Sequence, residues 1–476
     1  MRGARRGVEV GGTGLVVSPS SGVLRVVAAC ALALVFANQG CSLRIGESRT
    51  DIPFQLASLP SQPTWARESV HLVEWDGTRF PVLEVAMIDV SQDSGQTWLR
   101  AGSVSAASGR FAWTVSSAGL PIARLRVTIG LNARETPDLE LSPSQRKNYK
   151  WTKVVADAPF GARDGAGALV YDGKMWLIGG WNGGRFPRST ANDVWSSPDG
   201  VTWTEERPNT FLTDTFDKDA DWEGRHLAGY EVYDGKMWIL GGDPITGYYQ
   251  RDVWTSTNGK KWTKVVDPAG FGYRCLHMSA TFHDRLWVMG GQRIEQFVGK
   301  RWSEELPGAV LNDIWSSKDG ASWTRVETQG PIWEPRAFVS NTAIHRGRLY
   351  VVGGGTYDDP YAGRPDREYR SDVWSTADGA TWEKERETPP FAPRQSQNLA
   401  SFDDRLWVLA GHNPTGNLGD TWYSADGKNW YETTHVGFLE RHAASVWVHK
   451  GALFIGSGNA IDEEWRADVW RIDPIP

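Results

Sequence analysis

An Asp-x-Trp motif occurs six times along this chain, and in five copies a second tryptophan follows eight residues after the first. The paired tryptophans are Trp195 and Trp203, Trp254 and Trp262, Trp315 and Trp323, Trp374 and Trp382, and Trp422 and Trp430. The sixth copy, Asp468-Val469-Trp470, has only six residues after it. Repeats of roughly 50 residues are typical of small sheets that bury their faces only against neighbouring repeats. The sequence therefore predicts six such units.

Each repeat contains the pattern of four short strands. Two apolar runs flank Asp172-Gly173, and the second ends in Gly179-Gly180. Asp-Gly supplies the positive φ angles of a tight hairpin turn. The same dipeptide lies between later strand patterns, at Asp234-Gly235, Asp199-Gly200, Asp319-Gly320, Asp378-Gly379 and Asp426-Gly427. We therefore expect four-stranded antiparallel blades.

The sixth copy ends before its fourth strand, so this strand must come from elsewhere. Residues 150–154, Lys-Trp-Thr-Lys-Val, are similar to the fourth-strand pattern of residues 262–265. We expect this N-terminal segment to complete the sixth blade and close the ring.

These elements together resemble the kelch family of β-propellers over residues 148–476. The resemblance rests on Gly-Gly before a variable loop, Asp-x-Trp in the third strand and Trp in the fourth. Ala410-Gly411 and Ser457-Gly458 replace Gly-Gly in the last two blades. The resemblance implies an all-β, six-bladed propeller, but it does not fix an activity, because one fold hosts many functions.

The first 41 residues have the pattern of an export signal. Arg2, Arg5, Arg6 and Arg25 precede an apolar run at residues 26–37 that is short for a membrane span. Gly40-Cys41 resembles the cleavage and lipidation site of bacterial lipoproteins, although Asn38 and Gln39 depart from that pattern. We predict an exported protein of the bacterial cell envelope or the extracellular space, and lipidation at Cys41 stays open.

Residues 42–147 form a second predicted domain. Strand patterns at residues 82–88 and 123–129 are separated by turn residues, which favours a small β-sandwich of the immunoglobulin or fibronectin III kind. Residues 91–98 resemble the Asp-box hairpin of sialidases. We interpret this box as a turn, because an Asp side chain there satisfies nearby backbone amides.

Composition excludes several function classes. The net charge is −6, and no basic stripe with interleaved aromatic residues indicates nucleic-acid binding. Downstream of Cys41 the chain contains only Cys275, so it has no intramolecular disulfide framework. Common hydrolase, phosphate-binding and metalloprotease motifs are missing from the sequence, and no cofactor is predicted. Membrane contact is expected only through a lipid anchor at Cys41.

An arginine follows an aromatic residue by three positions at the entry to each innermost strand. These arginines are Arg163, Arg225, Arg274, Arg336, Arg394 and Arg441. Six guanidinium groups near a central channel could bind a carboxylate or phosphate. The alternative is a structural role, in which they pair with backbone carbonyls or with acidic neighbours such as Glu223, Glu334 and Glu440.

Residues near these arginines vary between the repeats, as an asymmetric pocket requires. The ligand-binding candidates beside the arginines are Asp164, His277 and Gln395, and those in variable loops are Trp181, Tyr248 and Tyr357. Histidine exchanges protons near neutral pH. The catalytic candidates are His226, His442, Glu223 and Glu440.

Two parts of the sequence resemble metal sites, one for calcium and one for copper. Asp217, Asp219 and Asp221 alternate in one loop and offer oxygen ligands for calcium. Trp222 and Ala228 depart from the EF-hand pattern, so the sequence favours a solvated loop. Cys275 resembles the crosslinked cysteine of galactose oxidase-type copper enzymes. Phe338 stands where that family's tyrosine is expected, and the Tyr-His ligands are missing, so the sequence argues against copper oxidase chemistry.

The sequence thus favours an exported binding protein that recognises a glycan or a protein through its loop-rich face. One alternative is a sugar-active enzyme, since bacterial sialic acid mutarotases resemble six-bladed kelch propellers and act outside the cytoplasm. A purely structural scaffold is the other alternative.

Overall fold

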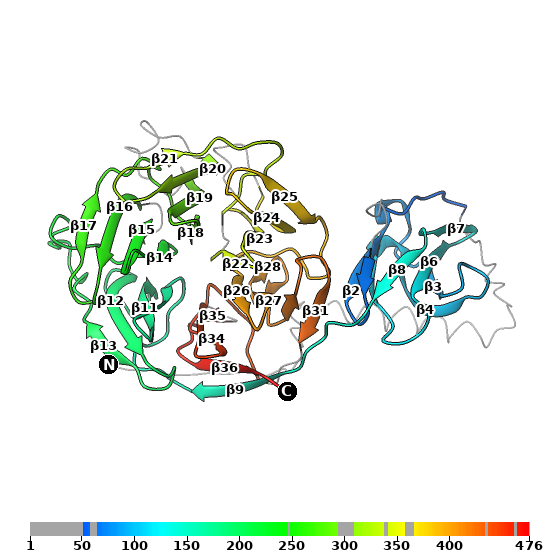
Figure 1. Cartoon of the computed structure of the whole chain (residues 1–476), viewed down its shortest axis with the longest axis horizontal. Coiled ribbons are helices and arrows are strands. Elements are labelled where there is room, and N and C mark those ends of the chain that lie inside the picture. The colour runs from blue at the N-terminus through cyan, green and yellow to red at the C-terminus, as the bar shows by residue number, and fades with distance from the viewer. Residues whose placement is uncertain are drawn as a thin grey trace, which may run out of the picture. The chain divides into compact units, whose positions relative to one another are not determined.

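The computed structural model describes residues 51–57, 64–245, 248–293, 309–337, 341–357, 366–433, 437–460 and 464–475. The predicted export signal, Cys41 and Phe338 lie outside these ranges. No helix among the described residues is long and apolar enough to cross a bilayer. The described chain forms an N-terminal sandwich and a propeller of radially arranged sheets (Figure 1).

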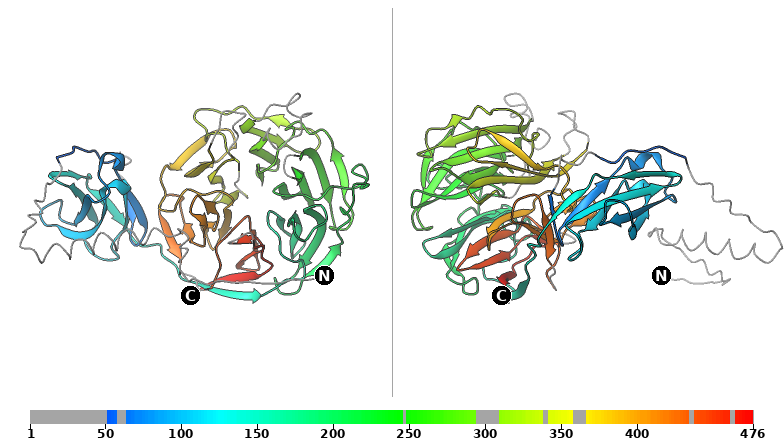
Figure 2. Two further views of the ribbon diagram at one scale, coloured as in Figure 1. Left: turned by 180° about the vertical axis from the view of Figure 1, so that it is seen from behind. Right: turned by 45° about the vertical axis from the view of Figure 1, so that its right-hand side comes forward.

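The propeller contains the six predicted four-stranded blades, which are arranged in a ring (Figures 1 and 2). Residues of the innermost strands line a cavity at its centre, the central channel. The first blade contains β10 (Gly167–Tyr171), β11 (Lys174–Trp181), β12 (Thr190–Ser197) and β13 (Thr204–Arg207). The second contains β14 (Gly229–Tyr233), β15 (Lys236–Ile245), β16 (Tyr248–Ser256) and β17 (Thr263–Val266). The third contains β18 (Met278–Thr281), β19 (Leu286–Arg293), β20 (Ala309–Ser317) and β21 (Thr324–Arg325). The fourth blade contains β22 (Ala343–His345), β23 (Arg348–Thr356), β24 (Glu368–Thr376) and β25 (Trp382–Arg386). The fifth contains β26 (Asn398–Phe402), β27 (Arg405–Leu409), β30 (Thr421–Ser424) and β31 (Trp430–Thr433).

The sixth blade contains strands from both ends of the propeller sequence. Its first three strands are β33 (Ser445–His449), β34 (Ala452–Gly456) and β36 (Val469–Pro474), and its outer strand is β9 (Tyr149–Val155). Trp470 pairs with Lys153, and Ile472 pairs with Trp151. The predicted closure by the N-terminal strand is therefore confirmed.

The turns between first and second strands each hold two consecutive residues with positive φ. Asp172-Gly173 and Asp234-Gly235 behave as the sequence predicted. His283-Asp284 and Asp403-Asp404 adopt the same conformation without glycine. The turn geometry is therefore common to the blades, while the Asp-Gly signal marks only some of them.

The turns between third and fourth strands in the first five blades have the Asp-box geometry, with Asn258 in place of the aspartate in the second blade. The third blade is an example. The hydroxyl of Ser317 accepts a hydrogen bond from the amide of Gly320 at 2.8 Å, and Asp319 Oδ1 accepts from the amide of Ser322 at 2.7 Å. Trp323 Nε1 donates to the carbonyl of Gly320 at 2.9 Å. The box around Asp93 has the same contacts, so the interpretation of these motifs as turns is confirmed.

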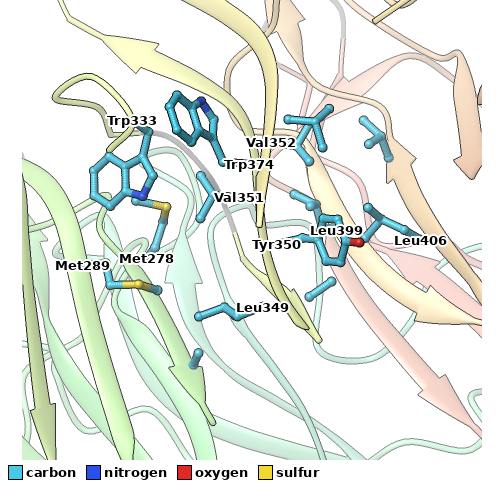
Figure 3. Close-up of a cluster of buried hydrophobic side chains, with 14 of the residues drawn as sticks. Met278, Met289, Trp333, Leu349, Tyr350, Val351, Val352, Trp374, Leu399 and Leu406 are labelled. Atoms are coloured by element: carbon cyan, nitrogen blue, oxygen red, sulfur yellow. The ribbon is translucent and has the colours of Figure 1, made fainter. Parts of the chain in front are cut away.

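Buried side chains fill the space between adjacent blades. Figure 3 shows one such cluster, which joins the third, fourth and fifth blades. Met278, Met289, Trp333, Val351 and Leu399 belong to it and are almost completely buried. Because each blade covers the face of the next, this packing stabilises the ring.

The N-terminal domain is a small sandwich, as predicted. One sheet has the order β1 (Thr64–Ala66), β8 (Leu139–Ser142), β6 (Ile122–Ile129), β3 (Val85–Ser91) and β4 (Leu99–Ser105), with β7 (Asn132–Glu135) paired to β6. The opposing strands are β2 (Val70–Glu74) and β5 (Arg110–Thr114). Its core contains Val73, Ile88, Trp113 and Leu125. Val70 also pairs with Trp430 of β31.

The predicted strand at residues 82–88 begins later than expected. Pro81 to Glu84 form a turn, in which the amide of Glu84 donates to the carbonyl of Pro81 at 3.0 Å, and β3 starts at Val85. Val82 and Leu83 are therefore exposed at the tip of a turn rather than paired in the sheet. A run of apolar residues alone does not distinguish an exposed turn from a paired strand.

Candidate functional site

Each of the six predicted arginines is buried and forms a bidentate ion pair with the aspartate of the Asp-x-Trp motif in its own blade. In the first blade, Arg163 Nη1 donates to Asp193 Oδ1 at 2.6 Å and Nη2 donates to Oδ2 at 2.9 Å. The other pairs are Arg225 with Asp252, Arg274 with Asp313, Arg336 with Asp372, Arg394 with Asp420, and Arg441 with Asp468. The side chains of the six arginines are no more than 3% exposed.

Two further contacts complete this unit in every blade. The arginine Nη1 also donates to the backbone carbonyl of the first residue of the Gly-Gly position. This residue is Gly179 in the first blade and Ser457 in the sixth. The tryptophan of the motif donates through Nε1 to the same aspartate, as Trp195 does to Asp193 at 2.8 Å. Arginine, Gly-Gly and Asp-x-Trp are therefore parts of one buried hydrogen-bonded network.

This network corrects the anion-binding hypothesis for Arg163, Arg225, Arg274, Arg336, Arg394 and Arg441. Their guanidinium groups do not face an open site, because each is occupied by an aspartate and by backbone carbonyls. The alternative, a structural role in which each arginine pairs with backbone carbonyls and an acidic residue, agrees with the observed contacts. However, the acidic partner lies in the third strand of the blade and is not one of the neighbours Glu223, Glu334 or Glu440.

The residue after each arginine lies in the segment that leads into the innermost strand of its blade, and the six innermost strands line a central cavity. We call this end of the cavity its mouth. In five blades its backbone forms an isolated antiparallel bridge with the residue after the Gly-Gly position. These bridges join Asp164 to Trp181, His226 to Asp243, Cys275 to Gln292, Ala337 to Gly355 and Gln395 to His412. In the sixth blade β32 (Arg441–His442) pairs with β35 (Asn459–Ala460), which places His442 opposite Asn459. We call these positions the mouth ring.

The backbone beneath the mouth ring is held by hydrogen bonds between blades. The amide of Leu227 donates to the carbonyl of Gly165 at 2.9 Å, and the amide of Gly165 donates to the carbonyl of Ala443 at 2.9 Å. Leu227, Leu276, Ser396 and Ala443 have φ between 44° and 57°, which is unusual for residues other than glycine. Such backbone strain is maintained only where the surroundings fix the conformation, so the mouth ring is a rigid frame.

Asp164, His226, Asp243 and His442 form a polar arc on one side of the mouth ring. His226 lies between two carboxylates, with Nδ1 3.5 Å from Asp243 Oδ1 and Nε2 3.8 Å from Asp164 Oδ1. His442 Nε2 lies 4.0 Å from Asp164 Oδ2, and its Nδ1 lies 2.7 Å from Asn417 Oδ1. The structure thus brings together three of the sequence-predicted residues, and adds Asp243 and Asn417.

Burial and neighbouring charges shift the pKa values in this polar arc. Burial raises the pKa of Asp164 to about 6, although the charge of His226 opposes this effect. Burial disfavours the charged form of His226, but the contacts with Asp243 and Asp164 outweigh it and raise the pKa of His226. Burial and the neighbouring His412 lower the pKa of His442 to about 3. Asp164 and His226 therefore both hold a proton to a higher pH than their ordinary pKa values would allow, whereas His442 stays neutral.

The opposite side of the mouth ring is apolar. Tyr249, Cys275, Leu276 and Ala337 are buried together, and Tyr357 packs against them. Burial raises the pKa of the Cys275 thiol well above its ordinary value, so this cysteine is not a reactive thiolate. The mouth therefore has one acid–base side and one apolar side.

The remaining predicted ligand-binding residues differ in accessibility. Trp181 is half-buried, with its ring 5.6 Å from that of His226, and Tyr357 lies under the guanidinium of Arg367. Tyr248 lies in β16, but its side chain is outside the described part of the structure.

Two candidates are corrected by their burial. The side-chain amide of Gln395 donates to the backbone carbonyls of Thr356 and Glu368 and is 3% exposed. His277 is also 3% exposed, and burial lowers its pKa to about 3. Both side chains support the inner strands and are not available to a ligand.

The two glutamate candidates do not join the polar arc. Glu223 accepts a hydrogen bond from Gln250 at 2.6 Å, and burial raises its pKa despite the nearby Arg225. Glu440 is exposed and lies beside Gly419, away from His442. The structure therefore gives no geometric support for either as a catalytic group.

The predicted calcium ligands do not converge. Asp217 accepts hydrogen bonds from the amides of Asp219 and Ala220, Asp219 lies near Lys264, and Asp221 pairs with Arg207. Across the described ranges, no three His, Cys, Asp or Glu side chains are placed to hold a metal ion. The calcium interpretation of this loop is therefore not supported.

Glu231 of β14 is a polar residue that the sequence did not indicate. It lines the central channel and accepts hydrogen bonds from Ser279 at 2.7 Å and Thr281 at 3.1 Å, both in the next blade. Burial raises its pKa to about 7, against the opposing effect of these two hydrogen bonds. The channel wall thus contains a carboxyl group that links two blades.

Comparisons with known proteins agree with the repeat pattern. No family model matches the chain. It is 24% identical over 224 residues, 44% of this chain and 21% of the other, to a leucine-zipper-like transcriptional regulator 1 homolog of Drosophila melanogaster. It is 29% identical over 188 residues, 38% of this chain and 45% of the other, to a Rab9 effector protein with kelch motifs of Bos taurus. The chain thus spans less than half the length of these relatives. Together with the six-bladed fold, the likeness indicates kelch-type repeats.

Proposed function

We propose that this chain is an exported, kelch-type binding protein that recognises a protein partner through the mouth ring on its loop-rich face. One observation carries the proposal: the six blades share one rigid backbone frame at the mouth, yet the half-buried side chains on this frame differ from blade to blade. They are Trp181, His226, His412, His442 and Asn459. A fixed frame with variable chemistry gives specificity at low entropic cost. The likeness to a Rab9 effector protein with kelch motifs also favours a protein partner.

A selection with a random displayed peptide library would test this proposal. The full chain serves as bait, and selected peptides are then measured against variants of accessible mouth residues, Trp181→Ala and Tyr357→Ala. The matched control is Val201→Ala, an exposed position at an Asp-box turn on the opposite face. We expect the mouth variants to lose peptide affinity and the control to keep it.

Other outcomes would contradict the proposal. Equal loss in the control would place binding elsewhere. A glycan array with the same variants addresses the glycan alternative. Glycan binding that depends on Trp181, without any peptide binding, would replace the protein partner by a carbohydrate ligand.

A sugar-active enzyme is a second candidate, and the polar arc is the observation that favours it. Mutarotation requires a base that removes the proton from the anomeric hydroxyl and an acid that protonates the ring oxygen as its bond to the anomeric carbon breaks. His226 Nε2 lies 3.8 Å from Asp164 Oδ1, burial raises the pKa of Asp164 to about 6, and the neighbouring carboxylates raise the pKa of His226. NMR measurement of anomer interconversion with neutral and carboxylated sugars would test it. No acceleration by the wild-type chain, or an unchanged rate in His226→Gln, would exclude this role.

A further inference from the structure

Four aliphatic side chains at one end of the sandwich are strongly exposed. Leu83 is 93% exposed, Val82 77%, Leu131 63% and Val85 50%. Large aliphatic side chains that gather on a surface mark an interaction site. We call this group the aliphatic tip.

The sheet register brings these residues together. Ala86 of β3 pairs with Ile129 of β6, so the start of β3 lies beside the end of β6. Val82 and Leu83 lie in the turn before β3, and Leu131 lies in the two-residue turn after β6. Two turns at one end of the sheet therefore present the aliphatic tip.

The tip is held in place by the sandwich. The hydroxyl of Ser105 donates to the carbonyl of Val82 at 2.6 Å, and the amide of Ala106 donates to the carbonyl of Glu84 at 2.7 Å. These bonds fix the turn while its apolar side chains face outwards. The exposure of Val82 and Leu83 thus follows from an ordered turn.

The described chain enters the sandwich at this same end. Arg79 Nη1 donates to the carbonyl of Pro53 at 3.0 Å, and the ring of Phe54 lies 6.0 Å from that of Phe80, which precedes the tip turn. Arg134, three residues after Leu131, lies over the ring of Phe54 at 5.6 Å. In the sequence, only residues 38–51 separate this entry point from the apolar run at residues 26–37. A lipid anchor at Cys41 would therefore tether a membrane, through the residues that follow it, to the end of the sandwich that carries the aliphatic tip.

We propose that the aliphatic tip inserts into the interface of a lipid bilayer. Its residues are aliphatic, whereas protein-binding hot spots are enriched in Trp, Tyr and Arg. A single lipid chain or weak anchor binds membranes only marginally, so a second apolar contact gives lasting attachment. Both signs of charge lie near the tip, because Glu84 is in the tip turn and Arg79 and Arg134 contact the adjoining residues 53 and 54. The apolar contact therefore dominates. This inference does not depend on the proposed mouth ring.

Site-specific labelling of the full chain tests this contact. Cys30 and Cys41 are changed to Ser, which removes any lipid acceptor and leaves only the buried Cys275. An environment-sensitive fluorophore is then attached to Leu83→Cys or, as the matched control, to Leu99→Cys. Leu99 is 74% exposed and pairs with Val90, at the opposite end of the sandwich. We expect vesicles of phosphatidylcholine, with or without phosphatidylglycerol, to shift the emission at position 83 to the blue and to leave position 99 unchanged.

A sedimentation assay with vesicles gives a second measurement. The double variant Leu83→Asp and Leu131→Asp should lower the membrane-bound fraction about tenfold, because charged side chains do not partition into the interface. The double variant Leu99→Asp and Leu120→Asp should leave it unchanged. Equal responses at both ends would overturn the proposal. An emission shift at position 83 without vesicles, lost when residues 1–41 are removed, would identify the chain's own N-terminal segment as the occupant instead.

Discussion

Arg225 and Asp252 form two parallel hydrogen bonds, each 2.7 Å long, in a site where the arginine side chain is fully buried. The same geometry recurs in each blade. Removing one partner of a buried ion pair leaves an uncompensated charge, which is far more costly than the loss of a surface pair.

Asp252→Ala should therefore lower the free energy of unfolding by about 3 to 5 kcal/mol. Denaturant unfolding at neutral pH would measure the change. Asp219→Ala is the control, because this exposed carboxylate lies 3.5 Å from Lys264 and should change stability by less than about 0.5 kcal/mol. A loss below about 1 kcal/mol for Asp252→Ala would contradict a structural role for the pair.

Glu231 should make stability depend on pH. Burial raises its folded-state pKa to about 7 from an ordinary value of 4.5. Between these values the folded state holds a proton that the unfolded state has released, so the contribution of Glu231 to stability falls as the pH rises through this window. Glu231→Gln removes this dependence.

Unfolding free energies of the wild type and Glu231→Gln should be compared from about pH 5 to about pH 8. The variant should gain on the order of 1 to 3 kcal/mol relative to the wild type over this range. Glu205→Gln, which replaces an exposed carboxyl group in β13, is a control for the general effect of pH. A constant difference between wild type and Glu231→Gln would show that the carboxyl group is not destabilised by burial.

The repeat pattern predicts the blades because Asp-x-Trp recurs once in each blade and a turn of the Asp-box type recurs in the first five, with Asn258 as the acceptor in the second. The partner of each arginine could also have been found. Arg163 and Asp193 belong to elements that recur in the same order in each repeat, and six buried charges require six opposite charges. Glu223 and Glu440 were predicted as partners because they are close to an arginine in the sequence. Closeness in the sequence does not show which residues of neighbouring strands meet.

The polar arc was only partly predictable. His226 and His442 were recognised as variable residues next to an arginine. Asp243 was missed, although it follows Gly241-Gly242 and therefore lies beside His226, to which a backbone bridge joins it in the same blade. Glu231 gave no local signal, because its environment arises from the hydroxyl groups of Ser279 and Thr281 in another blade.

The two carboxylates should determine the protonation of His226. Asp243→Asn should lower the pKa of His226, because it removes the larger of the two charges that stabilise the imidazolium. NMR titration of the histidine ring signals would measure this shift. In the control His442→Gln, the His226 signal should titrate as in the wild type or slightly higher. An unchanged pKa in Asp243→Asn would show that the polar arc is not electrostatically coupled.

Adjacent blades should be sensitive to the size of the residue at Gly259. A Cβ atom at this position would lie 2.3 Å from the ring of Trp176 in the neighbouring blade, and its φ is +72°. Gly173 has a similar φ of +68°, but nothing lies within 4 Å of a Cβ atom there. Gly173→Ala should therefore cost about 1 kcal/mol of backbone strain, while Gly259→Ala should cost about 1 to 3 kcal/mol more because the tryptophan must shift. Denaturant unfolding of both variants separates the two effects. Equal losses would mean that the contact between these blades tolerates the added methyl group.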